Sequence, residues 1–511
     1  MKILFITPTP ADISAFGVRI LSAYLKREGY QTESVFLPGG TEQLRFDQEF
    51  VYHYDKRIMN QIVELGKKSD IVGISFMSQY LDRAIQITSA IKKSTNTTVI
   101  WGGVHSTAKP EESLQYADMV CLYEGEEALM ELLRKISAGT DYYDTRNIWF
   151  KKNGGIVKND SRPYLQDLDS LPFFDFDLDG HYILDPVKNE IVRMKEEHLK
   201  RHLPRLSYFH NQFKITYRTM TSRGCPHRCT YCASSFMGTL RRRSVDNVIA
   251  ELVEIRRKYP FIEMINFFDD TFFAAPTRYF EEFGEAYKKH IGLPFHAQCS
   301  PTTVNEKKLD CLIDAGLVFT EMGIQTGSER TQKLYNRMVA NDKVLEAAHL
   351  IHKYRSKLLP PNYHIILDNP WETEEDVRET LQLILQLPRP FGKLCIASLI
   401  FFPGTELYKR AKAEGLIKDE FTDIYRKPFI YPSGTYLNYL VYLSGLRYVP
   451  QWLLKFLSTR TLIKLFSRKG LTGFYEGLYR ITELVQLVRK GATALFIGDF
   501  GRISRYVKRA K

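Results

Sequence analysis

The chain has 511 residues, of which 44% are hydrophobic and 25% charged. This length exceeds one compact core and predicts two or three domains of ordinary folded composition. Seven cysteines without a framework pattern argue against disulfides and for a reducing compartment. The start of the sequence lacks a signal-peptide pattern, and no long uncharged apolar run predicts a membrane-spanning helix, so we expect a cytoplasmic protein.

Residues 1–140 alternate short apolar runs with amphipathic segments. Strands are expected at 2–6, 31–36, 70–75, 98–101 and 118–122, and helices at 18–29, 80–93 and up to about 136. This alternation predicts a Rossmann-like, doubly wound parallel sheet. Ligands of such sheets bind outside the carboxyl ends of the strands, where the sequence places Ser75, Gly102, Gly103, His105, Glu124 and Gly125. The glycines also suit tight turns, and ordinary packing is the alternative for His105.

Residues 141–213 form a connector between two such regions. A small hairpin is expected around residues 153–155, where Asn-Gly-Gly separates two apolar runs. The stretch 189–210 is rich in Lys and Arg, and we expect it to be a largely helical, solvated segment; an insertion near the mouth of the active site is the alternative.

From residue 214 to about 430 strands and helices alternate again. Six strands are expected at 215–220, 263–272, 295–299, 319–327, 363–367 and 395–400, with helices between them such as 306–315 and 374–385. Six such units predict a (β/α)6 partial TIM barrel, whose active site lies at the carboxyl ends of the strands.

The loop after the first of these strands holds three cysteines in the spacing C-x3-C-x2-C: Cys225, Cys229 and Cys232. Three thiolates can hold three irons of a [4Fe–4S] cube and leave the fourth iron open to a ligand. The alternatives are a structural zinc site and a set of buried cysteines. A closed zinc site needs a fourth ligand at similar spacing, and the other four cysteines are scattered singly.

This loop resembles the signature of the radical S-adenosylmethionine (SAM) superfamily, and segments 268–272, 322–329, 369–376 and 401–408 are similar to its later motifs. In the third of these, Asn369 and Trp371 stand where the family has glycines. The resemblance implies that the three cysteines hold the cube, that SAM binds the open iron, and that a 5′-deoxyadenosyl radical forms. It also implies an external electron donor of the flavodoxin or ferredoxin type.

The resemblance also suggests residues that contact SAM. Tyr231 stands where the family has an aromatic residue near the adenine, with ordinary packing as the alternative. Asp269 and Asp270, at a strand end, could accept hydrogen bonds from the amino group of SAM, and capping the next helix is the alternative for Asp270. Glu321 or Gln325 could bind the ribose hydroxyls, because residues 321, 323 and 325 share one face of a strand.

Residues 1–140 resemble the cobalamin-binding domain that precedes the SAM domain in one class of these enzymes, through 73–75, 102–105 and 124–126. The segment Asp12-x-Ser14-x-x-Gly17 is similar to the D-x-H-x-x-G loop of cobalamin proteins, with Ser14 in place of the cobalt-ligating histidine. The resemblance implies a cobalamin bound without a histidine on cobalt, at Ser14 and the six residues at the strand ends.

The C-terminal region, 431–511, is aromatic, aliphatic and basic. From 451 to 511 it has thirteen Lys or Arg and three acidic residues, a net charge of +10 out of +12 for the whole chain. Such a sequence suits helices in a membrane interface, and peripheral contact with the inner face of the membrane is one expectation. The alternative is a helical subdomain that packs on the barrel. No nucleic-acid recognition module is visible.

Together with the resemblance, these features lead us to the hypothesis of a cobalamin-dependent radical SAM enzyme. Its expected reaction is methyl transfer to an unactivated carbon of a lipid-like or other small-molecule substrate. The same class includes cyclases and ring-rearranging enzymes, which stay open. A methylthiotransferase would have three further cluster cysteines in the N-terminal domain, where this chain has only Cys121. A hypothesis of another class is a membrane-attached iron–sulfur electron-transfer protein. No residue is assigned as substrate acid or base.

Overall fold

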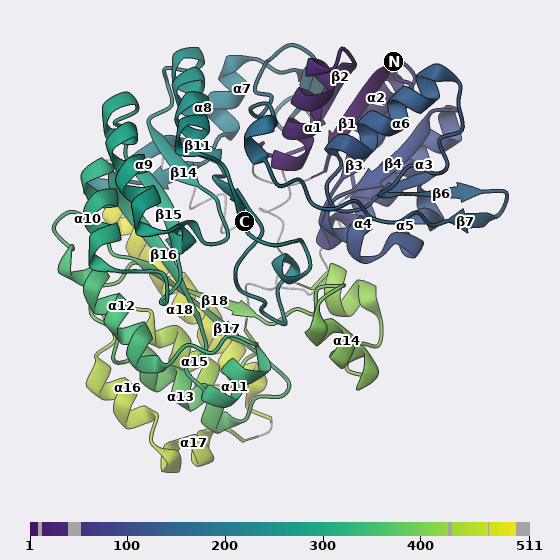
Figure 1. The fold of residues 1–511 in the computed structure, drawn as a ribbon. Coiled ribbons are helices and arrows are strands. Elements are labelled where there is room, and N and C mark those ends of the chain that lie inside the picture. Colours follow the sequence, from purple (N-terminus) through teal and green to yellow (C-terminus); the bar gives the residue numbers. More distant parts are fainter. Residues whose placement is uncertain (9–12, 39–52, 428–431, 469, 497–511) are drawn as a thin grey trace.

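The computed structural model describes residues 1–8, 13–38, 53–427, 432–468 and 470–496. Asp12, in the segment similar to a cobalamin loop, lies outside the described residues. The described chain forms two large sheets that lie side by side, each with helices packed against it (Figure 1).

The first sheet has nine strands in the order β7-β6-β5-β4-β3-β1-β2-β8-β9. Its parallel core consists of β1 (Lys2–Thr7), β2 (Gln31–Phe36), β3 (Ile71–Ser75), β4 (Thr98–Gly102) and β5 (Met119–Cys121). The hairpin β6 (Ile148–Lys152) and β7 (Gly155–Val157) extends one edge, as predicted. The hairpin β8 (His181–Asp185) and β9 (Glu190–Arg193), from the expected connector, extends the other edge.

Helices cover both faces of the first sheet. They are α1 (Phe16–Arg27), α2 (Lys56–Gly66), α3 (Leu81–Ser94), α4 (Val104–Ala108), α5 (Pro110–Tyr116) and α6 (Glu126–Ala138). In β1, Ile3 and Phe5 pack in one apolar cluster with α1 and α6, whereas Leu4 and Ile6 pack in a second cluster with α2 and α3. Because successive side chains of a strand point to opposite faces, both faces are buried, which confirms the doubly wound prediction.

The helical segment expected at 189–210 is wrong for most of its length. The chain there forms β9, a short helix α7 (Glu196–His202) and the strand β10 (Arg205–Ser207). Ile191 is buried against the first sheet, and Val192 on the opposite side packs against the core of the second. Two adjacent β-branched residues with opposite faces buried favour an edge strand over a charged helix.

The second sheet has seven strands, in the order β10-β11-β14-β15-β16-β17-β18. The six after β10 run parallel in chain order: β11 (Phe213–Thr219), β14 (Met264–Phe267), β15 (Phe295–Cys299), β16 (Leu317–Gln325), β17 (Asn362–Leu367) and β18 (Leu394–Ser398). The connecting helices are α8 (Val245–Lys258), α9 (Thr277–His290), α10 (Glu306–Ala315), α11 (Glu329–Leu334), α12 (Asn341–Lys353) and α13 (Glu374–Ile384). This curled parallel sheet confirms the predicted six-unit partial barrel.

After the barrel the chain first returns to the first sheet and then forms a helical region. Helix α14 (Glu406–Ala413) and a π-helical turn (Phe421–Tyr425) lie beside α4 and α5 (Figure 1). Lys109 on the first domain pairs with Glu420 at 2.6 Å, and Asp82 accepts hydrogen bonds from Arg426 at 2.9 Å. These contacts fix the two sheets relative to each other.

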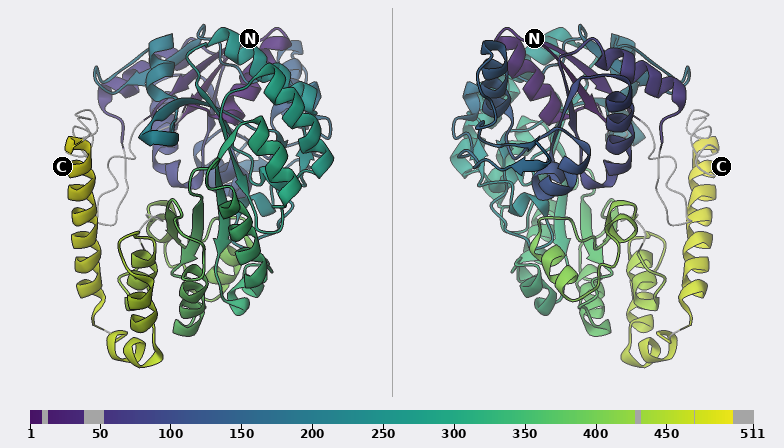
Figure 2. Two further views of the ribbon diagram at one scale, coloured as in Figure 1. Left: turned by 90° about the vertical axis from the view of Figure 1, so that its left-hand side faces the viewer. Right: turned by 90° about the vertical axis from the view of Figure 1, so that its right-hand side faces the viewer.

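The C-terminal helices are α15 (Tyr436–Ser444), α16 (Gln451–Leu457), α17 (Arg460–Phe466) and α18 (Thr472–Phe496). Helix α15 packs on α13, and its Leu440 and Val441 belong to the barrel's apolar core. Helix α18 runs along the outside of the molecule as its outermost element on that side (Figure 2). Among the described residues no helix is long and apolar enough to cross a membrane.

Candidate active site between the two sheets

A cavity of about 430 Å³ lies between the strand ends of the first sheet and the cysteine loop of the second. Five residues predicted from the first sheet line it: Ser75, Gly102, Gly103, Glu124 and Gly125. The opposite wall includes Met220, Arg223, Gly224 and Asp270, next to the cysteines. The cavity therefore joins the two sites that the sequence predicted separately.

Glycines keep the first wall of this cavity open. Gly103 has φ of +94°, and a Cβ there would lie 2.7 Å from the carbonyl oxygen of Phe76 and 3.1 Å from Ser75 Oγ. Neither the backbone conformation nor the space accepts a side chain at this position. At Gly17 on α1, a Cβ would lie 4.0 Å from Ser75 Oγ, so α1 also approaches the strand ends closely.

His105 and Ser14, also predicted to bind cobalamin, do not line this cavity. Both side chains are buried. The His105 ring stacks on Phe76, with ring centres 5.3 Å apart, and its Nδ1 lies 3.0 Å from Ser78 Oγ. Burial lowers the pKa of His105 to about 3, so the ring is neutral. This geometry matches the packing alternative for His105.

The start of the cysteine loop is held by a short ribbon, β12 (Ser222–Arg223) paired with β13 (Arg241–Arg242), and by Asp269. The buried Asp269 carboxylate accepts hydrogen bonds from Thr221 N at 3.0 Å, from Thr221 Oγ1 at 2.9 Å and from Ser222 Oγ. Gly224 has φ of +80°, and a Cβ there would lie 2.4 Å from the carbonyl oxygen of Thr239. Asp269 is thus occupied in shaping the loop, whereas Asp270 borders the cavity.

The three cysteines of the loop are buried or partly buried thiols. Burial raises the pKa of Cys225 and Cys232, so these thiols ionise readily only when a metal binds them. In the described part of the chain, no three His, Cys, Asp or Glu side chains are placed to hold a single metal ion. The donor set of three thiols on one loop fits a [4Fe–4S] cube, in which each thiolate binds a different iron.

Two further side chains contact these cysteines. Arg337 Nη1 lies 3.7 Å from Cys229 Sγ, while its Nη2 donates to the carbonyl oxygen of Gly323 at 3.0 Å. Thr271 Oγ1 lies 3.9 Å from Cys225 Sγ. The sequence reasoning missed Arg337, because it follows α11 in a turn and belongs to no motif.

The remaining predicted SAM residues fall into two groups. Tyr231 contacts the cysteine loop, because its side chain interacts with Cys229 and its ring meets Tyr335 edge-on, with ring centres 4.9 Å apart. Gln325 lies beside Gly323, where its Nε2 would be 2.7 Å from a Cβ at that glycine. Glu321 is occupied elsewhere, because it accepts a hydrogen bond from Asn362 at 2.7 Å and lies 3.4 Å from His364. Although burial alone would raise it, these partners hold the pKa of Glu321 at about 2.

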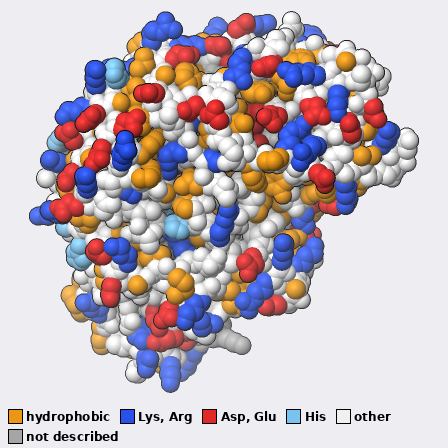
Figure 3. Space-filling view, viewed as in Figure 1, with side chains coloured by type: hydrophobic (Ala, Val, Ile, Leu, Met, Phe, Trp, Pro, Cys, Tyr) orange, Lys and Arg blue, Asp and Glu red, His pale blue; other side chains and the backbone are white. Residues whose placement is uncertain are grey.

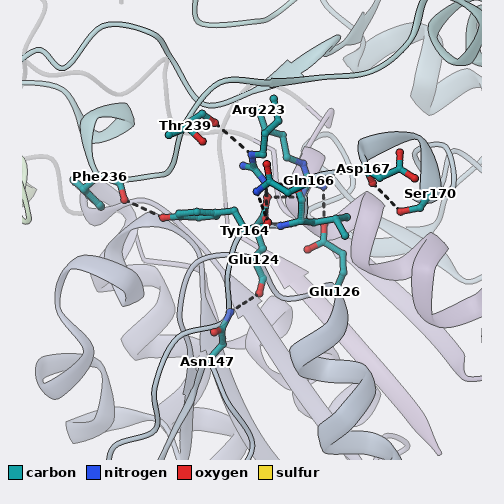
Figure 4. A network of polar contacts seen from close by, with 12 residues as sticks. Glu124, Glu126, Asn147, Tyr164, Gln166, Asp167, Ser170, Arg223, Phe236 and Thr239 are labelled. Atoms are coloured by element: carbon teal, nitrogen blue, oxygen red, sulfur yellow. Dashed lines mark hydrogen bonds and ion pairs between the residues drawn. The ribbon is translucent and has the colours of Figure 1, made fainter.

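An ionic network joins the two walls of the cavity (Figure 4). Arg223, two residues before Cys225, pairs with Glu124 at 3.0 Å and with Glu126 at 2.6 Å. Arg241 on β13 pairs with Glu124 at 2.8 Å. The Arg241 and Glu126 side chains are 4% and 6% exposed, so little water screens these charges. The Glu124 carboxylate thus ties the first domain to the cysteine loop, a role that its predicted cobalamin contact did not include.

Comparisons with known proteins agree with this division. Residues 3–133 match the family model of the B12 binding domain, and residues 219–384 match that of the radical SAM superfamily. The chain is 27% identical over 366 residues to the uncharacterized methyltransferase PH0819 of Pyrococcus horikoshii, covering 70% of this chain and 73% of that protein. It is 23% identical over 470 residues to the cytidylyl-2-hydroxyethylphosphonate methyltransferase of Streptomyces wedmorensis, covering 84% of each.

A solved structure has the same fold. The radical S-adenosylmethionine methyltransferase TsrM of Kitasatospora setae, with cobalamin and a [4Fe–4S] cluster bound, aligns with a TM-score of 0.60 at 17% identity. The alignment covers 81% of this chain and 75% of that one.

Proposed function

The chain belongs to the radical SAM superfamily and carries a B12-binding domain ahead of its radical SAM domain, and from this premise we propose that it methylates an unactivated carbon. Its cofactors are a [4Fe–4S] cluster, SAM and cobalamin. The observation that carries the proposal is the cavity, whose walls are the strand ends of the B12-binding domain and the start of the cysteine loop.

In this proposal Cys225, Cys229 and Cys232 hold the cluster. When bound, the cluster and SAM supply the radical that takes hydrogen from the substrate, and cobalamin supplies the methyl group. Arg337 donates toward Cys229 Sγ and thereby adds positive charge beside the cluster. Asp270 faces the cavity and is the carboxylate we assign to the SAM amino group, since Asp269 is already saturated with hydrogen bonds.

The cobalamin contacts we propose are Ser75, Gly102, Gly103 and Gly125, together with Gly17 on α1. All five line the cavity, and the glycines let a large planar ligand approach the backbone. Seven free cysteines among the described residues also suit a reducing, cytoplasmic location.

The substrate is a lipid-like or other small molecule, and the electron enters from an external flavodoxin- or ferredoxin-type donor. Support comes from the phosphonate methyltransferase, a relative that spans most of this chain and whose name gives a small-molecule substrate.

The test is anaerobic reconstitution followed by two measurements, 5′-deoxyadenosine formation and transfer of a deuterated methyl group from labelled SAM into extract metabolites. The wild type should do both, and the triple variant C225A/C229A/C232A should do neither. Cys311→Ala on α10, a partly buried cysteine outside the loop, is the matched control and should retain both activities.

Each alternative gives a distinct result. A cluster without SAM cleavage supports the electron-transfer hypothesis, and a product without labelled methyl supports a cyclase or rearranging enzyme. SAM cleavage by the triple variant would overturn the cluster assignment. Failure to retain a corrinoid after reconstitution with hydroxocobalamin would overturn the proposed cobalamin contacts.

A further inference from the structure

Helix α18 has two different faces, and only one of them packs on the protein. On the inner face, Tyr475 is buried, Tyr439 and Thr482 share a hydrogen bond of 2.9 Å, and Gln486 Nε2 donates to Tyr442 Oη at 2.7 Å. The outer apolar stripe consists of Phe474, Ile481, Leu484, Val485 and Val488, whose exposed fractions run from 53% to 64%. Residues three, four and seven apart lie on one side of a helix, so these five side chains form one continuous stripe.

The two helices before α18 add apolar side chains to the exposed surface. Trp452 and Phe456 on α16 are 70% and 59% exposed, and Leu465 on α17 is 47% exposed. Scattered apolar residues are normal on a protein surface, but this concentration on three consecutive helices marks an interaction site.

The charges around these side chains indicate what kind of partner covers them. Six exposed basic residues lie on the same helices or, in the case of Arg468, between α17 and α18: Lys455, Arg460, Lys464, Arg468, Arg480 and Arg489. Over the domains built on the two sheets, the face seen in Figure 3 carries both signs intermixed. Residues 451–496 hold eight Lys or Arg and two Glu, a net charge of +6, so a second copy of the chain would bring one basic region against another, whereas anionic lipid headgroups complement it.

We propose that α16, α17 and α18 dock on the surface of an anionic lipid bilayer. The apolar stripe and Trp452 enter the boundary between headgroups and acyl chains, and the basic residues contact the headgroups. No described helix crosses a membrane, so the contact is peripheral. This inference is independent of the reaction, because it rests on the C-terminal helices alone.

The experiment is co-sedimentation of the full chain with vesicles of phosphatidylcholine alone or with phosphatidylglycerol added. The wild type should bind only the anionic vesicles. It should dissociate when salt rises from about 0.1 M to about 1 M, because the screening length falls from about 10 Å to about 3 Å. The double variant Ile481→Glu/Val485→Glu should bind at least tenfold more weakly. Val187→Glu, at an exposed valine on the β8–β9 turn, is the control and should bind like the wild type.

Two further variants keep the proposal testable if the double glutamate variant misfolds. Lys455→Gln/Lys464→Gln leaves the apolar stripe intact and should weaken binding about fivefold for each charge removed. Trp452 should shift its fluorescence to shorter wavelength with anionic vesicles, and Trp452→Phe should abolish that shift.

Three results would overturn the proposal. The first is a wild type that does not bind anionic vesicles. The second is that the glutamate and glutamine variants bind these vesicles as tightly as the wild type. The third is a wild-type dimer in solution that Ile481→Glu/Val485→Glu converts to a monomer, with no vesicle binding by the dimer or the monomer. The last result would assign the stripe to a second copy of the chain.

Discussion

Replacing Glu124 with Gln tests whether the ionic network holds the two domains together at the cavity. The carboxylate accepts from Arg223 Nη1 at 3.0 Å, from Arg241 Nη1 at 2.8 Å and from Leu165 N at 2.9 Å. Glutamine keeps the shape of the side chain and removes its charge. Arg241, whose side chain is 4% exposed, then keeps carbonyl oxygens and the ring of Tyr164 as partners but no charged group.

The expected cost follows from this burial. Removing one partner of a buried ion pair costs about 3–5 kcal/mol, and the remaining carbonyl partners of Arg241 favour the lower end, about 3 kcal/mol. Unfolding entropy of about 2.1 cal/mol/K per residue gives about 1 kcal/mol/K for this chain, so Tm should fall by about 3 °C. If the two domains unfold separately, the shift of the affected transition is larger.

Scanning calorimetry of the full chain measures this shift. Glu127→Gln is the matched control: its carboxylate is 58% exposed and lies 3.9 Å from Arg162, so it should leave Tm within 1 °C, as expected for about 0–1 kcal/mol. Retained corrinoid should be unchanged in Glu124→Gln, because the carboxylate is engaged by the arginines. Equal Tm values for the two variants would refute the coupling, and a selective loss of corrinoid would restore Glu124 as a cobalamin contact.

Three further substitutions test individual parts of the site. Gly103→Ala should lower the free energy of unfolding by about 1–3 kcal/mol, because the residue has φ of +94° and its new Cβ would lie 2.7 Å from the carbonyl oxygen of Phe76. The same variant should retain less corrinoid, measured by absorbance, and an unchanged corrinoid content would contradict the proposed cobalamin wall. Arg337→Gln should lower the midpoint potential of the cluster by roughly 60 mV in an EPR redox titration, because a charged hydrogen bond of about 1.5 kcal/mol to the Cys229 thiolate is lost. Arg337→Lys, which keeps the charge, should restore part of the lost potential. Glu321→Gln should change the acid stability: the folded pKa of about 2 is below the ordinary 4.5, so the wild type has extra stability above pH 4.5 that disappears as pH falls towards 2. Urea unfolding should show about 3 kcal/mol of pH-dependent difference between wild type and variant across that window, and parallel curves would contradict the pairing with Asn362 and His364.

Regular elements with strong periodicity were predictable from the sequence. The strand at 295–299 and the helix at 306–315 match the structure to the residue, because an apolar run and an amphipathic pattern are both local signals. The stretch 189–210 was not predictable in the same way. Its charges suggest a helix, but Ile191 and Val192 gain more by pairing with the preceding strand β8 in a hairpin. That hairpin is itself added to β2, which lies about 150 residues earlier in the sequence, so a local pattern does not reveal it.

The candidate site likewise combines features that the sequence predicts with features that it does not. The cysteine spacing and the glycines at strand ends are short motifs, and the structure brings them to one cavity. The partners of Glu124, Asp269 and Glu321 were not predictable, because each is chosen by tertiary contacts over 40 to 120 residues away in sequence. The same holds for Arg337, whose nearness to Cys229 depends on how the turn after α11 folds back to the loop.

The orientation of the two sheets is itself part of the chemistry. A reaction that uses groups from two domains needs the reacting atoms to be about 3–3.5 Å apart and correctly oriented. Here that placement depends on two sets of contacts that the sequence motifs do not reveal. On one side, the arginines of the β12–β13 ribbon pair with Glu124. On the other, Lys109 pairs with Glu420 and Asp82 pairs with Arg426. The second set of contacts involves a segment that follows the barrel in the sequence, so both ends of the barrel domain are attached to the first domain. Substitutions there should therefore disturb methyl transfer more than SAM cleavage, since only methyl transfer requires both domains.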